Sequence, residues 1–127
     1  MGRTRSATLT DGELRLMRVL WKQGPATVGV IVEHLAGRRA PAYNTVLTMM
    51  RILEKKGYVK HRKAGRAFVF EPLVDEARAR RSALRYMLDR FFNNSPGTLV
   101  LSLLEHEDVA DEELQQLRNL IHQYEAR

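Results

Sequence analysis

The chain has 127 residues, of which 44% are hydrophobic and 28% are charged, a composition typical of one globular domain or of a small domain with an attached assembly element. It contains no cysteine, which excludes disulfides and thiolate metal sites, and its first residues lack the apolar segment of a secretory signal. No apolar run approaches the length of about 18 residues that a membrane helix needs, so we expect a cytoplasmic protein.

The net charge of +6 is distributed unevenly along the chain. Residues 1–73 carry 14 basic and 5 acidic side chains, whereas residues 74–127 carry 7 and 10. A basic first part and a mildly acidic second part indicate a polyanionic partner for the first part only. A solvated basic surface without such a partner is the alternative that charge alone leaves open.

Two helices are expected before residue 36. Thr10 and Glu13 have the spacing of a capping box, in which each side chain satisfies a free backbone N–H at the start of a helix. Gly24-Pro25 ends this helix, and Thr27 is suited to cap the next one. Apolar residues recur at helical spacing, so each helix buries one face. These residues are Leu14, Met17, Leu20 and Trp21 in the first helix, and Val28, Ile31, Val32 and Leu35 in the second.

A third helix is expected from about Ala42 to Lys56, followed by Gly57 as a natural C-terminal stop. It has two separate stripes at helical spacing, one apolar and one polar. The apolar stripe contains Val46, Met49, Met50 and Leu53, and the polar stripe contains Asn44, Thr48, Arg51 and Lys55. Asn, Thr and Arg side chains can form hydrogen bonds with base edges and phosphates. Leu47 lies near the polar stripe and could touch a thymine methyl group or pack under the first helix.

A basic hairpin follows this helix directly. Residues 58–63 and 66–72 have the pattern of two strands joined around Ala64-Gly65. Its tip is crowded with Lys60, Arg62, Lys63 and Arg66. Such charges can follow a phosphate backbone but carry little sequence information. Three helices and then a hairpin is the order of a winged helix, in which the third helix is the recognition helix and the hairpin is the wing.

From Val74 onwards the pattern is helical. We expect a long helix from Asp75 to about Phe92, a helix that starts at Ser95-Pro96, and a last helix from about Asp111 to Tyr124. The middle helix is apolar on nearly all sides and lacks a solvent-exposed polar face. Pairing with the same segment of a second chain would cover its apolar surface. Folding back onto the winged helix is the alternative. The expected interface residues are Leu99, Val100, Leu101, Leu103, Leu104, Leu117, Leu120 and Ile121.

No arrangement of residues indicates catalysis or metal binding. His34, His61, His106 and His122 are scattered and lack ligand spacing, so we interpret them as surface or locally satisfied histidines. The chain has neither a glycine-rich phosphate loop nor a nucleophile elbow. We therefore expect no enzyme activity, no metal and no cofactor.

Four stretches, taken in order, resemble the penicillinase repressor (BlaI/MecI/CopY) family of bacterial winged-helix transcription factors. They are LTDGELRLMRVLW (9–21), NTVLTMMRILEKKGYV (44–59), KAGRAFVFEP (63–72) and FFNNSPGTLVLSLLEHEDVADEELQQLRNLI (91–121). The resemblance implies a homodimeric repressor with an N-terminal DNA-binding domain and a C-terminal dimerisation domain. Such a repressor binds inverted-repeat operators and blocks transcription, often of genes for antibiotic resistance or related stress.

The resemblance also implies a route of inactivation. In the family, a membrane-bound zinc protease system commonly triggers cleavage in the dimerisation domain, and the matching bond here joins Ser102 and Leu103. The best-known members have an Asn-Phe bond at that place, whereas this chain has Ser-Leu. The C-terminal cysteine motif of the copper-sensing branch is absent, because the chain has no cysteine.

The sequence thus predicts a mainly α protein with a winged helix-turn-helix DNA-binding domain in residues 8–73 and a three-helix dimerisation domain in residues 74–127. We expect a dimeric repressor of near-palindromic operators, with the third helix in the major groove and the wing, residues 58–72, on the DNA backbone. The expected DNA contacts are Asn44, Thr45, Thr48, Arg51, Lys55, Arg62, Lys63 and Arg66. The alternative is a winged-helix interaction module that docks an acidic protein.

Overall fold

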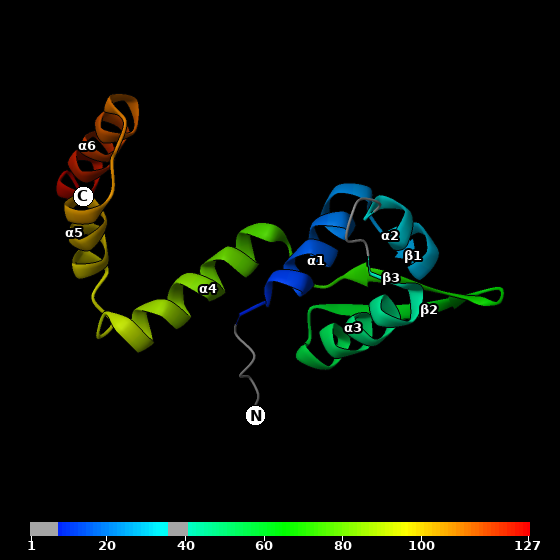
Figure 1. Cartoon of the computed structure of the whole chain (residues 1–127). Helices are drawn as coiled ribbons and strands as arrows, with labels where there is room; N and C mark the ends of the chain where they lie inside the picture. The colour runs from blue at the N-terminus through cyan, green and yellow to red at the C-terminus, as the bar shows by residue number, and fades with distance from the viewer. Residues whose placement is uncertain (1–7, 36–40) are drawn as a thin grey trace. The chain divides into compact units, whose positions relative to one another are not determined.

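The computed structural model describes residues 8–35 and 41–127, and within these residues the chain forms six helices and three strands (Figure 1). The chain divides into two compact units, Met1–Tyr86 and Met87–Arg127, so that the fourth helix contributes to both. The elements are α1 (Asp11–Gln23), β1 (Ala26–Thr27), α2 (Val28–His34), α3 (Tyr43–Lys56), β2 (Val59–Ala64), β3 (Ala67–Pro72), α4 (Glu76–Phe91), α5 (Pro96–His106) and α6 (Asp111–Glu125).

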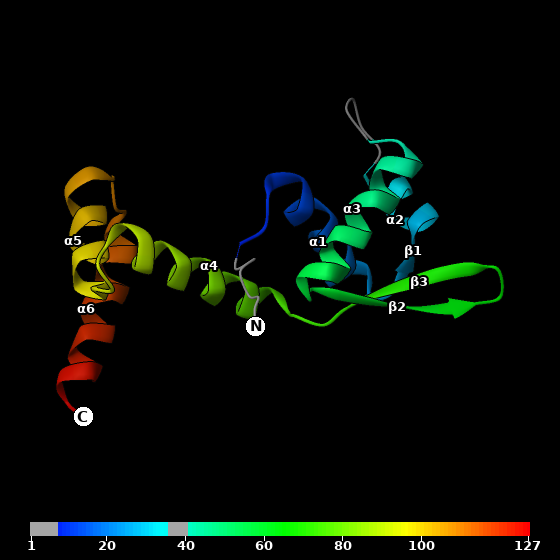
Figure 2. The same cartoon turned by 90° about the horizontal axis from the view of Figure 1, so that it is seen from below.

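The first unit is built around one core to which α1, α2 and α3 each contribute buried apolar side chains. A three-stranded antiparallel sheet of order β1-β3-β2 packs with them and adds Phe70 to the core. Both views show the hairpin of β2 and β3 reaching beyond the helices (Figures 1 and 2). The predicted order of three helices and a hairpin wing is confirmed. The most completely buried side chains are Leu16, Met17, Leu20, Ile31, Val46, Met50, Leu53 and Val59.

The strand β1 was not predicted from the sequence. Ala26 pairs with Phe70 and Thr27 with Val69, so β1 covers the edge of β3 that the wing leaves open. Two residues are too few to show the alternation by which a strand is recognised. Thr27 also caps α2, as predicted, because its hydroxyl oxygen accepts a hydrogen bond from the Val30 N–H at 3.2 Å.

The predicted capping box at the start of α1 is present. The Thr10 hydroxyl oxygen accepts from the Glu13 N–H at 3.1 Å, and the Glu13 carboxylate accepts from the Thr10 N–H at 2.9 Å. The buried face of α1 is broader than predicted, since it includes Leu16 and Val19, while Trp21 is only partly buried. This breadth arises because α1 packs against the other two helices and against β3.

Glu13 is a buried charge that joins two helices. Its side chain has a relative exposure of 6%, and its carboxylate lies 2.7 Å from the Lys56 ammonium at the end of α3. Burial alone raises the pKa of Glu13, but the hydrogen bonds from Lys56 and Thr10 and the charge of Lys56 outweigh it, so this pKa lies below its usual value of 4.5. The carboxylate therefore stabilises the fold above that usual value, and this contribution disappears as the pH falls through the lowered pKa.

The start of α4 belongs to the first unit. The Trp21 indole N–H donates to the Val74 carbonyl oxygen at 2.8 Å, and Ala79 is buried in the core. The Asp75 carboxylate accepts from the Arg78 N–H at 2.8 Å and so satisfies a free donor at the helix start. The compact units divide later, within α4, and a functional boundary after residue 73 stays a prediction.

The second unit contains the whole of α5 and α6 together with the last residues of α4. Asn93 and Asn94 adopt positive φ in the connection after α4, and the Ser95 hydroxyl oxygen caps α5 by accepting from the Thr98 N–H at 3.1 Å. Neither α5 nor α6 contains a buried residue, although both are rich in large apolar side chains. In the part of the chain that the structure describes, no helix is long and apolar enough to cross a membrane.

The buried pair gives a direct test of what stabilises the first unit. Lys56→Met leaves the Glu13 carboxylate buried without its cation, so we expect the free energy of unfolding to fall by about 1–3 kcal/mol. Urea unfolding followed by the fluorescence of Trp21, the only tryptophan, measures this change. Lys55→Met, on the exposed neighbour, is the matched control and should change stability by no more than about 0.5 kcal/mol. Equal effects of the two substitutions would mean that the pair does not stabilise the unit.

Candidate nucleic-acid interface

The recognition helix α3 presents a polar face that lies opposite its core stripe. Val46, Met50 and Leu53 are fully buried beneath the helix. The predicted contact residues of this helix are all exposed, and they are Asn44, Thr45, Thr48, Arg51 and Lys55. Within the described residues, none of the cations among them takes part in an ion pair. This face therefore offers hydrogen-bonding groups and uncompensated positive charge to a partner.

Local contacts define what two of these side chains can offer. The Thr48 hydroxyl donates to the Asn44 carbonyl oxygen at 3.0 Å, so its remaining hydrogen-bonding capacity is that of an acceptor. Lys55 is exposed, whereas Lys56 turns inward to Glu13. The helix ends at Gly57, whose φ of +89° is the left-handed conformation of a C-terminal stop, as predicted.

Leu47 packs rather than facing outward freely. It is partly buried and packs against the core of the first unit. It also lines a hollow of about 90 Å³, together with Arg51 and Glu54 of α3 and with His61, Phe68 and Phe70 of the wing. Of the two roles that the sequence left open for this leucine, the structure supports packing.

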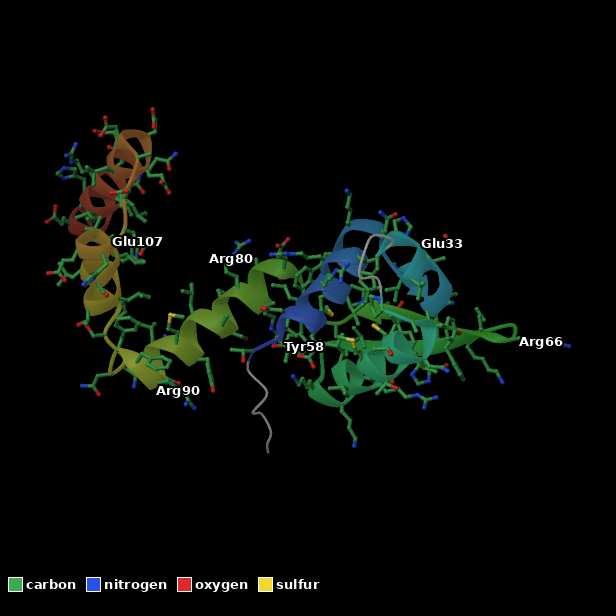
Figure 3. All side chains as sticks on the ribbon, in the orientation of Figure 1. Glu33, Tyr58, Arg66, Arg80, Arg90 and Glu107 are labelled. Atoms are coloured by element: carbon green, nitrogen blue, oxygen red, sulfur yellow. The ribbon has the colours of Figure 1, made fainter. Side chains whose placement is uncertain are left out.

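The wing is a tight hairpin with a turn one residue later than predicted. Ala64 pairs with Ala67, so Gly65 and Arg66 form the turn, and Gly65 supplies the required positive φ of +64°. Arg66 consequently lies at the far tip of the wing rather than in a strand, as Figure 3 shows. Phe70 is buried, but Phe68 on the same strand face is 41% exposed, since the core ends beneath the base of the wing.

The cations of the wing are not equivalent. Glu71 lies 3.2 Å from the Lys60 ammonium and 3.9 Å from the Arg62 guanidinium across the hairpin. Lys63 and Arg66 have no ion pair with any described residue. The outer part of the wing therefore carries the uncompensated charge, while the charge of Arg62 is partly offset.

A contact between α3 and the wing was not predicted from the sequence. The His61 Nδ1 atom lies 2.8 Å from each carboxylate oxygen of Glu54. His61 was interpreted only as a surface or satisfied histidine, and it is satisfied by this carboxylate. The pattern that could have indicated this contact is an acidic residue in the last turn of a helix, followed after the Gly57 stop by a histidine early in the next strand.

These elements define a winged-helix protein in which α2 and α3 form the helix-turn-helix pair and the β2–β3 hairpin forms the wing. The chain belongs to the penicillinase repressor family, since the model of that family matches residues 9–123. It is 30% identical over 119 residues to the penicillinase repressor of Bacillus licheniformis, a match that covers 94% of this chain and 93% of that relative.

Two further comparisons agree with this family. The chain is 25% identical over 113 residues to the methicillin resistance regulatory protein MecI of Mammaliicoccus sciuri, with 89% of this chain and 92% of the relative covered. The solution structure of the DNA binding domain of the repressor BlaI matches with a TM-score of 0.51 and 32% identity. This match covers 59% of the chain and 92% of that domain.

Proposed function

We propose that this protein is a dimeric transcriptional repressor that binds near-palindromic operator DNA. The observation that carries the proposal is the exposed hydrogen-bonding face of α3 beside a wing with uncompensated cations, in a chain similar to the DNA binding domain of BlaI. Residues 8–73 form the DNA-binding part and residues 74–127 the dimerisation part. The protein acts in the cytoplasm, where its operator is.

The two parts of the interface have different tasks in this proposal. Asn44, Thr45, Thr48 and Arg51 contact base edges in the major groove, where amide, hydroxyl and guanidinium groups can distinguish base pairs. The remaining cations hold the phosphate backbone and fix the register of α3 without reading sequence. These cations are Lys55, Arg62, Lys63 and Arg66.

The second unit supports dimerisation by the apolar surface that it leaves uncovered. Leu101 is 62% exposed on α5, and Ile121 is 53% exposed on α6. Between these helices lies a hollow of about 500 Å³. Its lining is apolar at Val100, Leu103, Leu104, Val109, Leu117 and Leu120, and polar at Glu107, Asp108, Glu113 and Gln116. Surfaces of this kind mark association sites, and a second copy would place two recognition helices on successive half-sites.

Inactivation by cleavage would act on the same surface. The Ser102–Leu103 bond, where the family resemblance puts the cut, lies inside α5. The Ser102 carbonyl oxygen is also bonded to the His106 ring at 2.9 Å, so the helix must open before a protease can bind. A cut here, made in response to a membrane sensor protease system, would divide the apolar surface and release the operator.

The salt dependence of binding tests the proposed function. Each phosphate contact should contribute about −0.9 to the slope of log affinity against log salt, so we expect a slope steeper than about −3 on duplex DNA. Fluorescence anisotropy with a labelled duplex at several salt concentrations measures it. A shallow slope on duplex DNA, with tight binding to an acidic protein instead, would contradict the repressor and favour the docking module.

Single substitutions separate base contacts from phosphate contacts. Arg51→Ala should lower affinity for the tight-binding duplex by about 1–3 kcal/mol and reduce discrimination against random duplex. Lys63→Ala should weaken both duplexes alike and make the salt slope shallower by about 1. Competition binding on the two duplexes measures both effects.

Arg62→Ala is the matched control for the wing, because Glu71 already offsets its charge. It should change the salt slope less than Lys63→Ala does. If Arg51→Ala weakens the two duplexes equally, Arg51 is a phosphate contact and not a base contact.

The dimer can be tested on α6, where the two faces differ in character. Ile121→Asp places a charge on the apolar face and should weaken dimerisation by at least about thirtyfold, as for an anchor worth ~2 kcal/mol. Sedimentation should then report about half the mass. Asn119→Asp adds the same charge to the polar face and should leave the dimer intact. An unchanged dimer for both Ile121→Asp and Leu101→Asp would place the interface elsewhere.

A further inference from the structure

Glu54 and His61 connect the recognition helix to the wing. Glu54 lies in the last turn of α3 and His61 near the start of β2, and both carboxylate oxygens lie 2.8 Å from the same ring nitrogen. This hydrogen bond joins α3 to the hairpin, whereas the ion pairs of Glu71 with Lys60 and Arg62 stay within the wing. The angle between helix and wing therefore has a specific polar contact to define it.

Two aromatic rings hold the His61 imidazole in place. Phe68 meets it edge to face, with ring centroids 5.1 Å apart and planes at 78°, and the Phe70 centroid is 5.6 Å away. Phe70 is also the cross-strand neighbour of His61 and is itself anchored in the core. The imidazole is thus fixed from the sheet side, and its Nδ1 atom points to Glu54.

The pairing has a consequence for Arg51. Arg51 precedes Glu54 by three residues on α3, a spacing at which arginine and a carboxylate commonly pair. Both residues line the same hollow as His61, yet Arg51 forms no ion pair with any described residue. Glu54 is instead bonded through both oxygens to His61. His61 therefore competes with Arg51 for the carboxylate of Glu54, the acidic residue of α3.

We infer that Glu54 and His61 are positioning residues for DNA recognition: they fix the wing against α3 and keep the Arg51 guanidinium unpaired and available to a base. This inference rests on the proposed DNA binding. Without His61, the Glu54 carboxylate would turn to Arg51 and pair with its guanidinium. The loss would thus come from the released carboxylate and not from the missing imidazole itself.

A double-mutant cycle tests this mechanism in the full-length chain. His61→Phe keeps an aromatic ring against Phe68 and Phe70 and removes both ring nitrogens, including the Nδ1 atom that binds Glu54. The probes are a duplex selected by the wild-type protein from a random-sequence pool and a random duplex of equal length. With Glu54 present, His61→Phe should lower affinity for the selected duplex roughly tenfold and reduce discrimination, the size expected for one impaired arginine–base contact.

In the Glu54→Gln background, the same His61→Phe substitution should lower the affinity for the selected duplex by less than about threefold, because the amide cannot form an ion pair with Arg51. A loss of equal size in both backgrounds would overturn the inference, since it would show that the histidine acts by packing alone. Thermal unfolding by circular dichroism checks that each variant is folded. If His61→Phe fails to fold, His61→Gln, which is smaller and polar, takes its place in the same cycle.

Glu71→Gln is the matched control. It removes a carboxylate from the same hairpin, but one that pairs only with Lys60 and Arg62 of the wing. It should leave discrimination between the duplexes unchanged, and a reduction as large as that of His61→Phe would contradict a specific role for the Glu54–His61 pair. A shallow salt slope for the wild type would refute the proposed function itself, whereas salt-dependent binding with equal losses in the cycle refutes this inference alone.

Discussion

The buried carboxylate of Glu13 is the contact on which the geometry of the first unit depends. It completes the capping box at the start of α1 and binds the ammonium of Lys56 at the end of α3. The Oε1 atom of Glu13 thus accepts hydrogen bonds from the Thr10 N–H at the start of α1 and from the Lys56 ammonium at the end of α3. A buried charge is costly unless such partners surround it, so a displacement of α3 along α1 would leave the Glu13 carboxylate without its cation. The recognition helix is held in register from beneath.

The wing is fixed in a similar way at its base and released at its tip. Phe70 enters the core, β1 pairs with β3, and His61 reaches Glu54 of α3. Beyond these contacts, β2 and β3 pair only with each other, and their side chains are exposed as far as Arg66 at the turn. A rigid base with a freely extending basic end suits a part that must meet a backbone of fixed shape but variable sequence.

Local features of this fold were predictable from the sequence, and features that need two distant segments were not. The periodicity of α3, its glycine stop and the capping residues Thr10 and Thr27 each depend on a few neighbouring residues, and the structure contains all of them. The sequence does not predict that Lys56 is paired and Lys55 is exposed, because neighbouring residues differ by a rotation of about 100° around the helix and this rotation decides which side chain meets Glu13. Contacts between residues far apart along the chain can be identified only once the core has assembled.

The uncovered apolar surface of α5 and α6 also ties the behaviour of the proposed repressor to its abundance in the cell. In the proposed dimer a partner copy covers these helices, which have no buried residues of their own, and mass action then sets how much of the dimer is formed. Occupancy of a two-fold operator would rise with the square of the free monomer concentration where dimers are scarce. Repression would then respond to a modest fall in protein level far more steeply than a monomeric binder could.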